Sequence, residues 1–336
     1  MMSETDVQRD ALLARIYNIN AGEFEHVAMD VWNYQYTHNP LYRNYCRLLH
    51  IGPERIGKIE DIPFLPISMF RYHDVRTGTW MPQACFSSSG TTGQLQSRHL
   101  VRDLDWYHSI SSLGFRQIFG SPSDYCWIGL LPSYLERPDS SLVNMVQYFM
   151  STGGHVESGF FPLVNHQVIS ALERARLRDM PVILLGVSFA MLDLFESFDV
   201  PVWDKLVLME TGGMKGRGRE LTRNELYERI RDRAGAIKIT SEYGMTELLS
   251  QAYKIQDHFH PSPTMRVCIR DISDPLQILG TGQRGCINVI DLANLDTCSF
   301  IGTDDIGIGY PDGGFDVLGR LDNTDLRGCN LLYTTA

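Results

Sequence analysis

The sequence predicts an α/β fold in which a largely parallel sheet is covered by helices on both faces. Between Tyr125 and Tyr243, short apolar runs alternate with amphipathic segments, and this alternation is typical of parallel strands joined by helices. From Met265 onward the chain changes to short strands and turns, which predicts a β-rich part. The 336 residues, 43% of them hydrophobic, suffice for a large core or two domains.

The first 62 residues are expected to be helical. Apolar residues recur at helical spacing from Ala11 to Ile19 and again from Phe24 to Tyr34. The stretch 62–67 contains two prolines, which disfavour both a helix interior and a central strand. It is therefore predicted to be an extended connector.

Beyond this connector, apolar runs and amphipathic spacing predict alternating elements. The strands of the α/β part are expected at residues 125–131, 181–186, 205–209 and 236–243. The helices are expected at residues 139–150, 167–178, 189–198 and 220–233. Strands of the β-rich part are expected at residues 265–269, 285–291 and 315–318. We thus expect a helical region 1–62, an α/β core 63–264, a β-rich subdomain 265–320 and a tail 321–336.

The stretch Phe86-Ser87-Ser88-Ser89-Gly90-Thr91-Thr92-Gly93 has the composition of an anion-binding loop. Hydroxyls and backbone N–H groups that glycine turns bring together bind phosphate. A strand is expected within residues 80–86 before it, and a helix within residues 98–119 after it. A solvated linker has a similar composition. No lysine follows Gly93, so the stretch is not the common P-loop.

Charge and composition exclude several classes of protein. The net charge of −10 and the pI of about 5.5 disfavour nucleic-acid binding, which depends on Lys and Arg. No apolar run reaches membrane-spanning length, and the polar start of the chain does not resemble a signal peptide. The seven cysteines are dispersed without a C-x-x-C pair, which disfavours a zinc site and fits reduced thiols in the cytoplasm.

A second informative stretch is Glu242-Tyr243-Gly244-Met245-Thr246-Glu247, which follows a predicted strand. A turn there brings the Thr246 hydroxyl and the Glu247 carboxylate to the end of the strand, where open α/β sheets bind ligands. A carboxylate at that place suits a phosphate-bound Mg²⁺. The alternative is an ordinary strand-to-helix turn with Thr246 as the helix N-cap.

Two further stretches carry charged residues in turns. Thr303-Asp304-Asp305 places two acids side by side, and Gly319-Arg320-Leu321-Asp322 follows a predicted strand. Ordinary turns have similar sequences, so neither stretch indicates a function alone.

Taken together and in this order, the four stretches resemble the motifs of the adenylate-forming (acyl-activating) enzyme superfamily. The order is Ser-Gly-Thr-Thr-Gly, Tyr-Gly-x-Thr-Glu, Thr-x-Asp and Gly-Arg-x-Asp. Further stretches make the pattern similar to the acyl-protein synthetase (LuxE-type) branch. They are Pro63-Phe64-Leu65-Pro66, Thr211-Gly212-Gly213-Met214-Lys215-Gly216-Arg217, Asp291-Leu292-Ala293-Asn294 and Arg327-Gly328-Cys329-Asn330-Leu331-Leu332.

The resemblance implies ATP and Mg²⁺ as cofactors and assigns roles to matching positions. The phosphate loop corresponds to Ser88, Ser89, Gly90, Thr91, Thr92 and Gly93. Tyr243 would flank the adenine, Thr246 would contact the α-phosphate and Glu247 would bind Mg²⁺. Asp305, rather than Asp304, would hold the ribose hydroxyls, with Arg320 near the ribose and phosphate. Cys329 would accept the acyl group.

The chain departs from the superfamily pattern in two respects. It ends sixteen residues after Arg320, so we expect the large-domain core without the small C-terminal domain and its catalytic lysine. The phosphate loop also lacks its usual downstream lysine. Lys215, which follows a glycine pair at a predicted strand end, is the candidate for neutralising the departing pyrophosphate; a solvated surface lysine is the alternative.

Cys329 fits the absence of that domain on physical grounds. It lies nine residues after Arg320, and nine extended residues span at most roughly 30 Å. A mobile tail would therefore bring the thiol to an acyl-adenylate above the sheet. Arg327 nearby favours the reactive thiolate. Without the resemblance, a buried tail cysteine would be the simpler interpretation.

Two other motifs would indicate different functions, a dinucleotide-binding site and a hydrolase nucleophile. Gly280-Thr281-Gly282-Gln283-Arg284-Gly285 matches the dinucleotide fingerprint, but a strand-like run follows it rather than a helix. Gly186-Val187-Ser188-Phe189-Ala190 is close to the nucleophile elbow of α/β-hydrolases. An acyl hydrolase or acyltransferase built on Ser188, with His258 or His260 as base, is thus one alternative. A non-catalytic nucleotide-binding subunit is another.

The predicted reaction is ATP-dependent activation of a carboxylic acid, followed by transfer to Cys329 and on to a partner such as an acyl reductase. Apolar residues near Trp127, Phe161 and Phe189 suit a fatty chain, although an aryl acid would also fit. The sequence fixes neither the acid nor the oligomeric state.

Overall fold

The computed structural model describes residues 4–88, 95–131, 139–212 and 223–321. By their contacts the residues form two units. The first combines Met1–Thr79 with Pro263–Ala336, and the second is Trp80–Ser262. The predicted four-part division of the chain stays a prediction. Within the described ranges, no helix is both long and apolar enough to cross a membrane.

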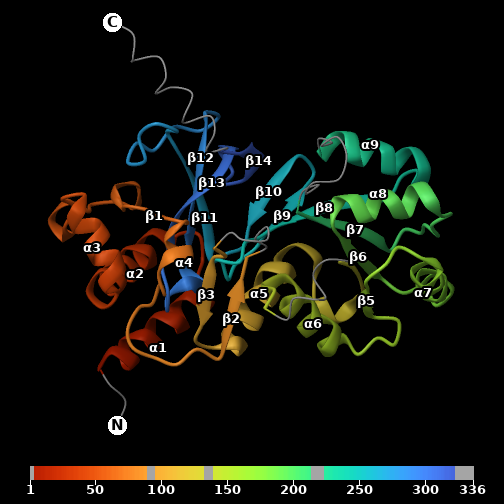
Figure 1. The fold of residues 1–336 in the computed structure, drawn as a ribbon, viewed down its shortest axis with the longest axis horizontal. Coiled ribbons are helices and arrows are strands. Elements are labelled where there is room, and N and C mark those ends of the chain that lie inside the picture. Colours follow the sequence, from red (N-terminus) through yellow and green to blue (C-terminus); the bar gives the residue numbers. More distant parts are fainter. Residues whose placement is uncertain (1–3, 89–94, 132–138, 213–222, 322–336) are drawn as a thin grey trace, which may run out of the picture. The chain divides into compact units, whose positions relative to one another are not determined.

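The first unit packs N-terminal helices onto an antiparallel sheet from the other end of the chain (Figure 1). The helices are α1 (Glu4–Tyr17), α2 (Phe24–His38), α3 (Pro40–Leu48) and α4 (Met69–Tyr72), with short 3₁₀ turns at Pro53–Arg55, Ile59–Asp61 and Leu292–Asn294. The strands are β1 (Leu65–Pro66), β11 (Met265–Arg270), β12 (Arg284–Asp291), β13 (Phe300–Gly309) and β14 (Phe315–Arg320).

Buried polar contacts hold the first unit together across a long stretch of sequence. Arg9 of α1 donates two hydrogen bonds of 2.6 Å to Asp296, and Gln35 of α2 donates to the carbonyls of Asn294 and Leu295 at 3.0 Å. Because bonds to buried charges are strong when both partners are present, they fix the helices on the turn between β12 and β13. The connector predicted at 62–67 contains the short strand β1, which runs parallel to β13.

The second unit is the predicted α/β part. Its strands are β2 (Ala84–Ser87), β3 (Arg98–Val101), β4 (Cys126–Leu130), β5 (Gly159–Phe161), β6 (Val182–Gly186), β7 (Leu206–Thr211), β8 (Lys238–Tyr243), β9 (Ala252–Ile255) and β10 (His258–Pro261). Its helices are α5 (Leu104–Phe119), α6 (Ser141–Gly153), α7 (His166–Leu177), α8 (Ser188–Ser197) and α9 (Arg223–Ala234), with a 3₁₀ turn at Pro122–Asp124.

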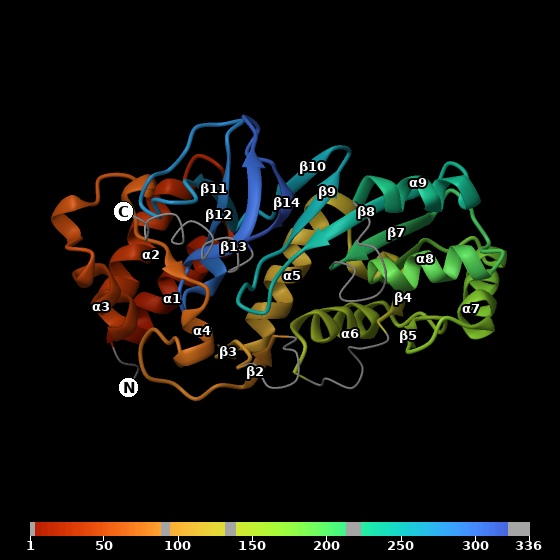
Figure 2. The ribbon, with the colours of Figure 1, turned by 45° about the horizontal axis from the view of Figure 1, so that its top comes forward.

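The main sheet of this unit has the order β10-β9-β8-β7-β6-β4-β5. The strands from β5 to β8 are parallel, and β9 and β10 continue antiparallel. Helices α5 and α6 lie on one face and α8 and α9 on the other (Figures 1 and 2). Strands β4, β6 and β7 are buried along their whole length, as expected for parallel strands covered on both faces.

The strands and helices that were predicted agree with the structure to within a few residues, but β5, β9, β10 and β13 were not predicted. The turn expected at residues 303–305 is wrong, because these residues lie within strand β13. The structure also differs after the hydroxyl-rich stretch. The segment 98–119, expected to contain a helix, begins with strand β3, which pairs antiparallel with β2 before α5 starts. The three apolar or aromatic positions after Arg98 are too few to indicate a strand by periodicity. Asp103 ends this strand segment because its side chain caps α5 at the amide of Trp106.

Candidate functional site

The parallel strands of the second unit end at one edge of the sheet and bring polar residues together there. Gly186 of β6 lies opposite Glu210 of β7, and Thr211 of β7 lies opposite Glu242 of β8. Ligands of open α/β sheets bind at this carboxyl edge. Of the residues predicted for the nucleotide, the edge carries Tyr243, Thr246 and Glu247.

Glu210 is the centre of a buried set of hydroxyl contacts. Its Oε1 is 2.6 Å from Oγ of Ser188, and its Oε2 accepts a hydrogen bond of 2.9 Å from Oγ of Ser241. The hydroxyl of Tyr227 bonds in turn to Ser241, and Nε of Arg223 lies 3.6 Å from Oε2. A buried carboxylate is retained only when its oxygens are satisfied in this way. Together with Thr211 and Glu242, residues Ser188, Glu210 and Ser241 are called the strand-end network below.

Glu242 is the second carboxylate of this network. Its Oε2 accepts a hydrogen bond of 2.8 Å from Oγ1 of Thr211, and its side chain is buried. Burial raises the pKa of Glu242 to about 7; the bond from Thr211 lowers it and the nearby Glu210 raises it further. A Cβ at Gly244 would collide with Oε1 of Glu242. The carboxyl group therefore packs directly on the backbone that leads to Thr246.

The end of β8 and the turn after it hold three predicted site residues, with Tyr243 last in the strand and Thr246 and Glu247 in the turn. Glu247 and Tyr243 are both buried, and the Tyr243 ring packs against that of Phe259 at 5.8 Å. The next regular element among the described residues is strand β9, antiparallel to β8. The alternative of Thr246 as a helix N-cap is therefore wrong. The Thr246 carbonyl instead lies 2.8 Å from Nδ1 of His99 in β3.

The hydroxyl-rich stretch joins β2 to β3, and the structure describes its two ends. The amide of Ser88 donates to the Ser97 carbonyl at 3.0 Å, and the amide of Ser97 donates to Oγ of Ser88 at 2.9 Å. These two bonds close the neck of the hairpin. Ser89, Gly90, Thr91, Thr92 and Gly93, which complete the predicted phosphate loop, lie outside the described residues.

Asp304, Asp305 and Arg320 meet in the first unit. Asp305 of β13 lies opposite Arg320 of β14. Nε of Arg320 is 3.8 Å from Asp305, and Nη2 is 3.9 Å from Asp304. The side chain of Asp305 is 13% exposed, compared with 42% for Asp304 and 59% for Arg320. Ion pairs of this length are weak, above all where the side chains are exposed, as those of Asp304 and Arg320 are.

Ser188 does not have the environment of a hydrolase nucleophile. It is the first residue of α8, and its hydroxyl contacts Glu210 and, at 2.8 Å, the Gly212 carbonyl. The non-glycine residues with positive φ in the described chain are His50, Asp179 and Gln256, so the strained backbone of a nucleophile elbow is not found at Ser188. The hydroxyl is committed to the strand-end network.

Cys329 and Lys215 lie outside the described residues, as do residues 322–336 of the predicted tail. The cysteines that the structure describes are free thiols. Burial raises the pKa of Cys46 and of Cys268 to about 12 and also raises that of Cys126 and Cys298. These thiols are therefore poor nucleophiles.

Sequence reasoning missed His99, Glu210 and Glu242. Glu242 directly precedes the Tyr-Gly-x-Thr-Glu motif, and a carboxylate at the end of an apolar strand was an available signal. His99 had none, because a single histidine between Arg98 and Leu100 is most simply explained by packing. The role of Glu210 as the centre of these hydroxyl contacts is visible only in the folded sheet, where Ser188 and Ser241 lie beside it.

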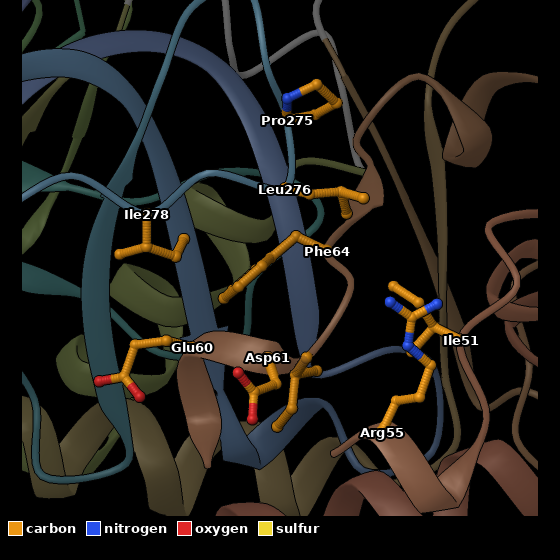
Figure 3. Close-up of a pocket in the computed structure, with 9 residues that line it drawn as sticks. Ile51, Arg55, Glu60, Asp61, Phe64, Pro275, Leu276 and Ile278 are labelled. Carbon is orange, nitrogen blue, oxygen red and sulfur yellow. The ribbon is translucent and has the colours of Figure 1, made fainter. Parts of the chain in front are cut away.

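A pocket of about 230 Å³ lies in the first unit (Figure 3). Its lining includes Ile51, Arg55, Glu60, Asp61, Phe64 and Leu276. None of the residues that line it was predicted for the nucleotide. Its polar side chains carry charges of both signs, and it therefore favours neither an anion nor a cation.

Comparison with solved structures identifies the class of fold. Two structures of 2-hydroxyisobutyryl-CoA ligase, one with 2-HIB-AMP and CoA and one in the post-adenylation state, superpose with TM-scores of 0.63 and 0.64 over 92% of this chain at 13% identity. They are covered to 78% and 70% of their own length. ATP-bound MatB from Rhodopseudomonas palustris superposes with a TM-score of 0.52 at 17% identity. The superposition covers 70% of this chain and 48% of the MatB chain. The chain has the α/β fold of the large domain of adenylate-forming ligases, as predicted.

Sequence comparison shows which proteins with this fold the chain resembles. The acyl-protein synthetase (LuxE) family matches residues 13–123. A long-chain-fatty-acid–luciferin-component ligase of Aliivibrio fischeri is 24% identical over 331 residues, covering 90% of this chain and 85% of that protein. The ligase of the same name from Photorhabdus luminescens is 34% identical over 68 residues, 20% of this chain and 58% of that sequence. The chain is a homologue of LuxE-type acyl-protein synthetases, and the resemblance inferred from the motifs is confirmed.

Proposed function

We propose that the protein activates a long-chain fatty acid with ATP and then carries the acyl group on its own cysteine. The observation that carries this proposal is the placement of Tyr243, Thr246 and Glu247 at the carboxyl edge of the sheet, in a chain homologous to acyl-protein synthetases. Because binding sites of open α/β sheets lie at this edge, the motif is in a position where it can meet a nucleotide.

In the first proposed step, a carboxylate oxygen of the acid bonds to the α-phosphorus of ATP. The bond between that phosphorus and the bridging oxygen breaks, and pyrophosphate leaves with the electron pair. Thr246 is proposed to contact the α-phosphate and Tyr243 the adenine. The phosphate loop, which includes Ser88, is proposed to hold the β- and γ-phosphates through its hydroxyls and N–H groups.

Asp305 and Arg320 are proposed to bind the ribose, with Arg320 also near the phosphates. The distance of 3.8 Å between Nε of Arg320 and the Asp305 carboxylate supports this role, since a weak pair breaks at little cost. Asp305 is the better candidate than Asp304, because it is more buried and its amide donates to Oγ1 of Thr303 at 3.1 Å. That bond fixes its backbone in β13.

Glu247 is proposed as the ligand of Mg²⁺. Carboxylate and hydroxyl oxygens are the hard ligands that this ion prefers, and Glu247 and Thr246 supply both within one turn. When bound, Mg²⁺ would neutralise charge on the phosphates. Lys215 is proposed to add a positive charge for the leaving pyrophosphate.

In the second proposed step, the thiolate of Cys329 attacks the acyl carbon, the bond to the phosphate oxygen breaks and AMP leaves. Splitting one acyl transfer into two easier steps is the general advantage of a covalent intermediate. The thioester is proposed to pass to a partner such as an acyl reductase, in the cytoplasm, where its thiol stays reduced.

Carboxylate-dependent exchange between ATP and pyrophosphate tests the first step. We expect exchange with Mg²⁺ and long-chain fatty acids, and weaker exchange with aryl acids. Absence of exchange with every acid would overturn the proposal and leave a nucleotide-binding subunit as the alternative. A labelled fatty acid tests the second step, since Cys329→Ser should keep exchange and lose the hydroxylamine-sensitive label. A label that persists would exclude Cys329 as the acceptor.

A further inference from the structure

His99 connects two parts of the second unit that the sequence motifs treat as separate. It lies in β3, two residues after the hairpin neck formed by Ser88 and Ser97. In the ladder it is opposite Phe86, and its side chain is 1% exposed. Its Nδ1 lies 2.8 Å from the carbonyl oxygen of Thr246. This buried contact links the hairpin to the turn after β8.

The direction of this hydrogen bond follows from chemistry. A carbonyl oxygen can only accept, so the proton must lie on Nδ1 of His99. Burial lowers the pKa of His99 to about 4, although the bond to Thr246 opposes this shift. The ring is therefore neutral near pH 7 and carries its one proton on the nitrogen that faces the turn, which leaves Nε2 as an acceptor.

The same turn is supported from its other side by Glu242. The carboxyl group packs on the backbone at Gly244 and is held by Thr211 at the end of β7. The peptide segment between Gly244 and Thr246 thus has a buried hydrogen-bond donor at one end and a buried carboxyl group at the other. Support of this kind reduces the freedom of Thr246 and Glu247 before any ligand arrives.

We propose that His99 is a positioning residue that sets the place of Thr246 and Glu247 relative to the β2–β3 hairpin. This inference rests on the proposed function, in which both segments bind ATP. His99 itself touches no substrate and acts through the Thr246 carbonyl. If the bond is removed, the turn and the hairpin move independently, and the phosphate contacts no longer form together. A misplacement of about 1 Å at a reacting group costs on the order of 10²-fold in rate.

A packing role for His99 makes different predictions from a positioning role. Packing alone would lower stability and would affect the use of ATP and fatty acid to the same degree. Positioning affects the nucleotide selectively, and it is restored by any side chain that offers a donor in the place of Nδ1. Asparagine does so, because its side-chain NH₂ lies at a similar distance from the backbone.

The experiment compares His99→Leu and His99→Asn in ATP–pyrophosphate exchange with saturating fatty acid. We expect His99→Leu to lower kcat/KM for ATP on the order of 10²-fold while KM for the acid changes less than about twofold. His99→Asn should recover to within about tenfold of the wild type. His155 is the matched control: its Nε2 also contacts a backbone carbonyl, that of Ser123 at 3.0 Å, and His155→Leu should leave kcat/KM for ATP unchanged.

A second readout needs neither ATP nor activity. In ¹⁵N spectra of histidine-labelled protein at neutral pH, His99 should show the Nδ1–H tautomer, because its Nδ1 faces the Thr246 carbonyl. The opposite tautomer would overturn the inference even if His99→Leu failed to fold. If the wild type catalyses ATP–pyrophosphate exchange and His99→Leu has the same kcat/KM for ATP, the positioning role alone is overturned. Wild-type protein without exchange would overturn the proposed function itself.

Discussion

The carboxylates at the ends of β7 and β8 are buried and lie 2.6 to 2.9 Å from hydroxyl oxygens. Asp304 and Asp305 of the β13–β14 hairpin instead lie 3.8 to 3.9 Å from Arg320, and of the three side chains only that of Asp305 is mostly buried. We call the second set the hairpin acids. Buried groups that lose a partner are costly, whereas exposed pairs break with little loss. The difference indicates that the strand-end network fixes backbone, whereas the pairs between the hairpin acids and Arg320 contribute little to the fold.

The largest expected effect is that of Glu247→Gln. This residue lies in the turn on which Glu242 of the strand-end network packs, but it is proposed to bind the metal. Loss of its charge should lower kcat for ATP–pyrophosphate exchange about a thousandfold, or roughly 4 kcal/mol. Glu228→Gln on the exposed side of α9 is the control and should have no effect. Exchange at the normal rate in Glu247→Gln would place the metal ligand elsewhere.

Glu242→Gln should change how stability depends on pH. The folded pKa of about 7 lies above the ordinary value of 4.5, so the folded state binds the extra proton between these values. The free energy of unfolding from this group is therefore greatest below pH 4.5, falls as the pH rises to about 7 and is flat above. The fall amounts to about 3 kcal/mol.

Urea unfolding of both proteins from pH 5 to pH 7.5 measures this contribution. The wild type should lose more stability over the range than Glu242→Gln, and the exposed variant Glu173→Gln on α7 should behave like the wild type. If the free energy of unfolding depends on pH in the same way in the wild type and in Glu242→Gln, the carboxyl group does not change its ionisation over this range. Burial would then not raise the pKa of Glu242, and the contrast with the hairpin acids would be lost.

Ser188→Ala tests whether this serine belongs to the network or to a catalytic apparatus. Removing its hydroxyl takes a partner from buried Glu210 and should reduce the free energy of unfolding by about 1–3 kcal/mol. ATP–pyrophosphate exchange should stay within about tenfold of the wild type. Removing a nucleophile would cost many orders of magnitude, and a loss of that size in any acyl-transfer assay would revive the hydrolase alternative.

The smallest effect on folding is expected for Arg320→Gln. Its exposed contacts should contribute less than about 1 kcal/mol, so urea unfolding should barely change. The KM for ATP should rise severalfold, since the proposed ribose contact would be lost while the fold is kept. A large loss of stability without a change in KM would reverse the comparison and make the hairpin acids a structural feature.

The sequence predicted the elements whose signals are local. The apolar runs of β4 and β6 and the capping Ser140 before α6 specify their own structure, because burial on both faces and helix capping act within a few residues. Strand β3 was not predicted, since four residues paired with β2 obtain their stability from the partner strand rather than from their own pattern.

The candidate site also contains residues that a local sequence motif indicates and residues that only the folded structure reveals. Thr246 and Glu247 were predicted because a short motif places both after a strand. The residues that support them, His99 and Glu242, were not predicted. They act through contacts with Thr246 and Thr211, which are distant in the sequence and meet only in the folded chain, so no sequence pattern indicates them. The Ser88 hydroxyl was predicted as a phosphate ligand, and its bond from Ser97 was not foreseen, for the same reason.

The raised pKa values of Cys46, Cys126, Cys268 and Cys298 have a consequence for the acyl transfer. An acyl-adenylate reacts with whichever thiolate reaches it, and the fraction of thiolate falls tenfold for each unit by which a pKa rises above the ambient pH. A chain that passes an acyl group to one cysteine gains selectivity when its other thiols are kept protonated. In the proposed reaction, burial would thus suppress misdirected acylation at those four positions and would protect the fold from modification by the acyl-adenylate.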